Sequence, residues 1–159
     1  MRRFAVTSIA LCAMALSTQA FAQAPTPYGE TINLEQAKKA AGAAAEFAAK
    51  NGWAMAITVV GPAGDLVYFT KMDNTQYASV TISQHKARAA ATFRRPTKVF
   101  EDRVATPAGV PALSLDGVIA SEGGFPIVMN GKIVGALGCS GGTGQQDGQT
   151  CQAGIDAMK

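Results

Sequence analysis

The stretch GGFPIVMNGKIVGALGC, residues 123–139, decides the fold of this chain. It holds two apolar runs, residues 125–129 and 132–139, which meet at Asn130-Gly131. Asn-Gly is the strongest two-residue hairpin signal, because a type I′ turn needs two residues at positive φ. We therefore predict two antiparallel strands that pair with each other, introduced by Gly123-Gly124.

A second hairpin is predicted upstream. Residues 53–60, WAMAITVV, and residues 66–72 are apolar runs of strand length on either side of a turn at 61–65 that holds two Gly and one Pro. Two consecutive hairpins favour an antiparallel sheet.

Helical patterns lie between and around these hairpins. Alanines recur at helical spacing over residues 34–50, where Asn33 and Gln36 form a capping box and Asn51-Gly52 ends the helix. Further helices are predicted over residues 79–94, stopped by Pro96, over 98–104, capped by Thr97, and from Asp147 onward; a Pro- and Gly-rich loop follows residue 104. This order of elements predicts an α+β domain with helices covering the sheet.

The first residues have the layout of a secretory signal peptide. Arg2 and Arg3 precede an apolar run over residues 4–16, and Ala20-Phe21-Ala22 is a small-x-small cleavage site. We predict cleavage after Ala22, a flexible Pro-rich leader over residues 23–30, a domain over 31–159, and a periplasmic or secreted location. No later run is long enough for a transmembrane segment after processing.

Charge and cysteine usage narrow the class of partner. The formal net charge is +3, but without Arg2 and Arg3 only 12 of the 14 Lys and Arg remain against 11 Asp and Glu. Such a balance gives no support for binding nucleic acid. Cys139 and Cys151 can form a disulfide in an oxidising compartment, or remain two buried thiols.

The glycine-rich segment after residue 137 matches G-x-S-x-G at residues 138–142. His85 is the only histidine of the chain and lies far upstream, so Ser140 has no downstream His to complete a hydrolase triad. No Lys follows these glycines, which excludes a P-loop. Two readings stay open: a flexible exit from the strand, or backbone N–H groups around Ser140 that hold a carboxylate at the start of the last helix.

The helix over residues 79–94 carries the clearest chemical signal. Lys86 falls in the apolar stripe of Ile82, Ala89 and Phe93. A Lys on an inward face either snorkels along its stem or meets a negative charge. The negative charge would come from an anionic ligand or from a buried carboxylate such as Asp73, Glu122 or Asp147.

Haem is the cofactor that the donor set allows. One His and two Cys lack the spacing of a protein-only zinc site, whereas haem needs as few as one axial ligand. His85 lies at the edge of the apolar stripe and is either structural or a ligand; the available donors are Tyr68, Met72, His85 and Met129. Arg94, with Arg95, either ends a solvated helix or clamps a carboxylate or a subunit contact.

The residues then resemble a known family. Residues 82–101, 122–141 and 145–147, together with Lys71-Met72-Asp73, are similar to the GlcG/HbpS (DUF336) family over residues 31–158. The resemblance implies a profilin-like fold, a five-stranded antiparallel sheet flanked by helices, and homo-oligomers. Some exported relatives bind haem, and a related module ends some cobalamin adenosyltransferases. His85, Cys139 and Cys151 depart from the family pattern.

Together these signals predict an exported protein that binds a small ligand, haem or a related tetrapyrrole, between the helix over 79–94 and the last hairpin. His85 or a methionine, Met72 or Met129, would bind the iron, and Lys86, Arg94 and the loop around Ser140 would face anionic groups. Two alternatives remain: an enzyme acting on a small carboxylated or aromatic metabolite with Lys86 as acid, base or anion anchor, and a structural or sensory oligomer.

Overall fold

The structure is a computed structural model that describes residues 24–159 of the 159-residue chain. The predicted signal peptide lies outside these residues. Helices and strands follow in the order α1 (Leu34–Lys50), β1 (Ala56–Val60), β2 (Leu66–Lys71), α2 (Ala78–Phe93), α3 (Lys98–Val104), the 3₁₀ helix η1 (Pro107–Ser114), β3 (Gly124–Met129), β4 (Lys132–Ser140) and α4 (Gly144–Asp156).

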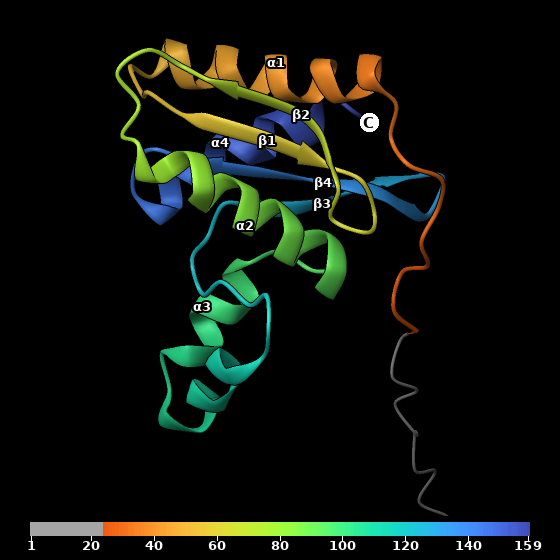
Figure 1. Ribbon diagram of the computed structural model, residues 1–159, viewed down its shortest axis with the longest axis vertical. Helices are drawn as coiled ribbons and strands as arrows, with labels where there is room; N and C mark the ends of the chain where they lie inside the picture. The colour runs from red at the N-terminus through yellow and green to blue at the C-terminus, as the bar shows by residue number, and fades with distance from the viewer. Residues whose placement is uncertain (1–23) are drawn as a thin grey trace, which may run out of the picture.

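The strands form one antiparallel sheet in the order β2-β1-β4-β3. The helices cover both faces: α2 packs on β1, β3 and β4, while α1 and α4 pack on each other and on the opposite face (Figure 1). Covered on both sides, β1 and the last six residues of β4 are buried without alternation. The predicted α+β class is confirmed.

The expectation of five strands is wrong, because the described residues hold four. Beside these strands the described chain adds an isolated parallel bridge between Tyr28 and Ile133. Ile133 donates its N–H to the carbonyl oxygen of Pro27 and accepts the N–H of Gly29, each at 2.8 Å, which completes this bridge. Pro27 has no N–H with which to continue the ladder toward the N-terminus. Residues 27–29, within the predicted leader, thus run beside β4.

Local signals place most element ends correctly. The capping box of Asn33 and Gln36 is present, and Asn130 and Gly131 have φ of 50° and 71°, as a type I′ turn requires. The last helix begins at Gly144, three residues before the prediction, because Thr143 and Gln146 form a second capping box. Residues 107–114, predicted to be a loop, form η1.

Thr97 does not cap α3, which corrects the prediction. Its backbone is helical, with φ −66° and ψ −21°, rather than extended as an N-cap residue normally is. Its hydroxyl instead accepts a hydrogen bond from the backbone N–H of Gly124 at 3.0 Å. Thr97 therefore ties the start of α3 to the first residue of β3.

Candidate functional site

His85 and Lys86 lie on different faces of α2. Successive residues of an α-helix are rotated by about 100°, so neighbours in sequence can meet different surroundings. Lys86 points into the protein with only 1% of its surface exposed, while the side chain of His85 is exposed. The two residues therefore do not belong to one ligand site.

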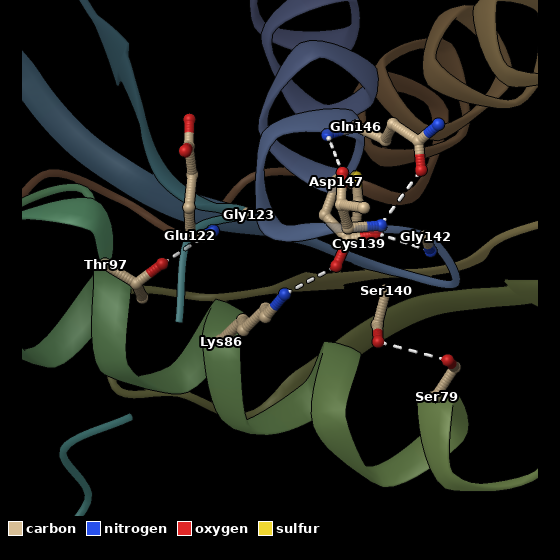
Figure 2. A network of polar contacts seen from close by, with 12 residues as sticks. Ser79, Lys86, Thr97, Glu122, Gly123, Cys139, Ser140, Gly142, Gln146 and Asp147 are labelled. Carbon is tan, nitrogen blue, oxygen red and sulfur yellow. Dashed lines mark hydrogen bonds and ion pairs between the residues drawn. The ribbon is translucent and has the colours of Figure 1, made fainter. Parts of the chain in front are cut away.

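Lys86 pairs with Asp147 in the interior. Its Nζ lies 2.7 Å from Oδ2 of Asp147, and the two side chains are 1% and 4% exposed (Figure 2). The second carboxylate oxygen accepts the backbone N–H of Gly142 at 3.0 Å. Of the three carboxylates that the sequence offered to Lys86, Asp147 is the partner.

Burial is the largest influence on the pKa of Asp147. It raises the pKa of the Asp147 carboxyl above its ordinary value, while Lys86 and the backbone amides of Gly142 and Gly141 oppose the rise. Asp147 stands in the first turn of α4, where the helix dipole favours a negative charge. A Cβ on Gly123 would come within 3.1 Å of the Lys86 Nζ, so Gly123 packs tightly against the pair.

The glycine-rich segment after β4 is occupied by internal contacts. The N–H of Gly142 binds Asp147, and the N–H of Thr143 donates to Oε1 of Gln146 at 2.9 Å. Ser140 is 3% exposed, and its hydroxyl donates to Oγ of Ser79 at 3.1 Å. The segment therefore resembles a packed junction rather than an open cradle for an anion.

A disulfide holds this junction together. Cys139, at the end of β4, is bonded to Cys151 in α4, and their Cα atoms are 5.7 Å apart. The bridge that the sequence left open is thus present. It joins the central strand to the helix that carries Asp147.

The predicted pocket between α2 and the last hairpin is filled, which corrects that expectation. Gly138 of β4 lies directly under α2, where an added Cβ would be 2.6 Å from the backbone N of Ala87. The two elements approach this closely because Gly138 and Ala87 are small. The interface is part of the core.

A cavity opens instead at the outer side of α2. It has a volume of about 480 Å³ and is lined by His85, Arg88, Asp116, Gly117 and Val118. Three of these residues, Arg88, Asp116 and Gly117, also line a neighbouring cavity of about 600 Å³ that reaches the turn between β1 and β2. The Nε of Arg88 donates to the carbonyl oxygen of Gly64 in this turn at 3.3 Å. We call the first of these the His85 cavity.

The other predicted site residues lie apart from it. Met72 is half-buried against the main core, as is Tyr68. Met129 ends β3 and lines a different cavity, near the start of α1. Arg94 is exposed in a left-handed conformation with φ 56°, and its guanidinium lies 5.3 Å from the centre of the Tyr28 ring.

Two residues of the His85 cavity were missed at the level of sequence. Arg88 follows His85 by three positions, so helical spacing alone could have paired them. Asp116 comes from the loop after η1, and no local pattern links it to α2. In the part of the chain that the structure describes, no three His, Cys, Asp or Glu side chains gather as metal ligands, and no helix has the length and hydropathy to cross a membrane.

Comparisons with known proteins agree with this architecture. Residues 32–156 match the family model described as "Haem degrading protein HbpS-like". The protein GlcG of Escherichia coli K12 is 39% identical over 110 residues, which cover 69% of this chain and 81% of GlcG. An uncharacterised 15.0 kDa protein of Citrobacter freundii, from the dhaT-dhaS intergenic region, is 33% identical over 131 residues, 80% of this chain and 92% of its own.

Among solved structures, a double mutant of HbpS from Streptomyces reticuli superposes with a TM-score of 0.76 at 26% identity. The match covers 95% of this chain and 99% of the HbpS chain. The match therefore extends over nearly the whole of both chains.

Proposed function

The chain belongs to the HbpS-like family of haem degrading proteins, and from this premise we propose that it binds haem or a related tetrapyrrole in the His85 cavity. The observation that carries the proposal is the position of His85. Its imidazole is exposed at the wall of a cavity of about 480 Å³, a volume within the range of small-molecule sites.

The donor set supports His85 as the axial ligand. Tyr68 and Met72 are half-buried and packed against the main core, and Met129 lines a different cavity, so none of these three side chains lines the His85 cavity. His85 can approach an iron without unfolding anything. A neutral imidazole is a common axial ligand of haem.

The other residues of the cavity suit the rest of a tetrapyrrole. Arg88 presents a guanidinium, which pairs with a propionate carboxylate through two parallel hydrogen bonds. Val118 offers an apolar contact to the macrocycle, and Asp116 is of the type that orients a ligating imidazole. Bound haem would supply iron redox chemistry at this position.

Titration of the purified protein with hemin tests the proposal. We expect a saturable Soret shift at micromolar hemin, its loss in His85→Ala, and weaker binding in Arg88→Met. Met72→Leu and Met129→Leu are the matched variants for the competing donors, and Arg94→Met is the matched variant for the competing cation. The absence of a saturable shift, or an unchanged shift in His85→Ala, would overturn the assignment.

We also propose that the protein is exported and self-associates. The pattern of residues 1–22 supports export, and the family resemblance supports homo-oligomers. Intact-mass measurement on protein from the periplasm or the medium should give a chain that begins at Gln23. Light scattering after size exclusion, with and without hemin, should give a mass above that of one chain; the mass of one chain in both conditions would exclude self-association.

A further inference from the structure

Another cavity shares no lining residue with the His85 cavity. Its volume is about 540 Å³, and α3, the start of β3 and α4 enclose it. Its lining residues are Pro96, Lys98, Val99, Asp102, Glu122, Phe125, Gly148, Gln149 and Gln152. Part of this lining is apolar: Pro96, Val99, Phe125 and Gly148. Val99 is 43% exposed. We call it the Glu122 cavity.

Glu122 is the only half-buried carboxylate in this wall within the described residues. Its side chain lies against α4, where a Cβ added to Gly148 would be 2.7 Å from its carboxyl carbon. Gly148 thus leaves the space that the carboxylate occupies. The backbone N–H of Glu122 donates to Oε2 of Glu101 at 2.6 Å, which fixes the main chain at this point.

The charges around the cavity do not balance. Lys98 is already engaged by Asp102, with 2.6 Å between Nζ and Oδ1. Within residues 24–159, neither Glu101 nor Glu122 forms an ion pair of its own. The cavity therefore combines apolar walls with excess negative charge, which suits an apolar molecule that carries a positive charge.

The ionisation of Glu122 is consistent with this surrounding. Burial raises the pKa of its carboxyl; Lys98 opposes the rise and the negative charge of Glu101 adds to it. A cation that entered the cavity would reverse the effect of Glu101 and favour the ionised carboxylate. Binding would then release a proton at a pH close to that pKa.

We propose that the Glu122 cavity is a second ligand site, which takes a small protonated amine bearing an apolar ring or chain, with Glu122 as its counter-ion. The ammonium group pairs with the carboxylate, and the apolar part lies against Val99 and Phe125. The ring of Phe125 offers a further favourable surface to a cation. This site is independent of hemin and of His85.

Three probes of the same shape test the proposal on the purified protein: benzylamine, benzyl alcohol and benzoate. We expect benzylamine to bind saturably at millimolar concentration, benzyl alcohol at least about tenfold more weakly, and benzoate not at all. Two-dimensional NMR should show shifts at Phe125 and Gly148, unchanged by saturation with hemin or by His85→Ala. Binding should weaken as the pH falls through the pKa of Glu122, where the carboxyl becomes neutral.

Variants separate the role of the charge from the role of the fold. Glu122→Gln keeps the shape and should lower the affinity for benzylamine at least about tenfold. Gly148→Ala should also lower it, because the new methyl group displaces the Glu122 side chain. Glu35→Gln, an exposed glutamate in the first turn of α1, is the matched control and should bind like wild type.

Circular dichroism and thermal unfolding show whether each variant is folded. Equal affinity of benzylamine for the wild type and for folded Glu122→Gln would overturn the proposal. Equal affinity of the wild type for benzylamine and benzyl alcohol, or no saturable binding of benzylamine, would also overturn it.

Discussion

His85 and Lys86 are adjacent on α2, yet they meet opposite surroundings. Lys86 ends in a buried ion pair with Asp147, under Gly123 and beside the disulfide of Cys139. His85 lines an open cavity, and its side chain is exposed rather than packed in the core. The two faces of α2 thus differ in what a substitution would cost. On the inner face it would break a buried ion pair, whereas on the outer face we expect only a small loss of stability.

The largest effect is expected where that inner face is broken. Lys86→Met leaves the Asp147 carboxylate buried without its partner, which should lower the free energy of unfolding by about 3–5 kcal/mol. The double variant Lys86→Met, Asp147→Asn removes both charges and should recover most of the loss. Urea unfolding of the three proteins measures both values. A loss below about 1 kcal/mol in Lys86→Met would mean that the pair does not hold the junction.

The same variant has a predictable dependence on pH. The pKa of Asp147 in the folded protein is raised above its ordinary 3.8. Between pH 3.8 and this raised pKa, the folded state therefore binds more protons than the unfolded state. The free energy of unfolding therefore falls as the pH rises through this window. Lys86 lowers the pKa of Asp147, so in Lys86→Met this pKa is higher and the pH window is wider. As the pH is lowered toward 4, Asp147 becomes neutral in the variant, and the loss of stability caused by Lys86→Met should shrink. A defect that grows on acidification would contradict this.

A smaller effect is expected from crowding the contact between α2 and β4. Gly138→Ala places a methyl group against the backbone carbonyl oxygen of Ser83 and 2.6 Å from the backbone N of Ala87, which should cost about 1–3 kcal/mol of stability. Gly42→Ala in α1 is the matched control, because nothing lies within 4 Å of its added Cβ. That change should stabilise the protein by about 0.5–1 kcal/mol. Thermal unfolding of both variants should show shifts of opposite sign.

The smallest effect is expected on the outer face. His85→Ala should change the free energy of unfolding by no more than about 0.5 kcal/mol, because the side chain is exposed and no core contact is lost. The same variant should lose the hemin signal. A large loss of stability in His85→Ala would show that the outer face is not independent of the fold.

Short-range signals predicted the fold well. Asn33 and Gln36 placed the start of α1, and Asn130-Gly131 placed the last hairpin, since caps and tight turns depend on residues a few positions apart. The number of strands was wrong, because it came from the family resemblance rather than from the strand patterns of this chain.

The candidate site was less accessible from sequence. Helical spacing correctly turned Lys86 inward, but three carboxylates were possible partners, and 61 positions separate Lys86 from Asp147. Asp116 could not be assigned to the site for the same reason: it is distant from α2 in sequence, and the loop after η1 brings it beside His85 and Arg88. Local patterns also could not show that Glu122 and Gly148 line the same cavity.

The close fit of Lys86, Gly123 and Asp147 predicts how these positions vary among homologues. Any side chain at position 123 would meet both a positive φ of 121° and the Cβ of Asp147 at 2.7 Å. Losing one charge of the pair is costly, whereas exchanging both for apolar groups is nearly neutral. Positions 86 and 147 should therefore covary among homologues, with Lys and Asp kept or replaced together, while position 123 should remain glycine.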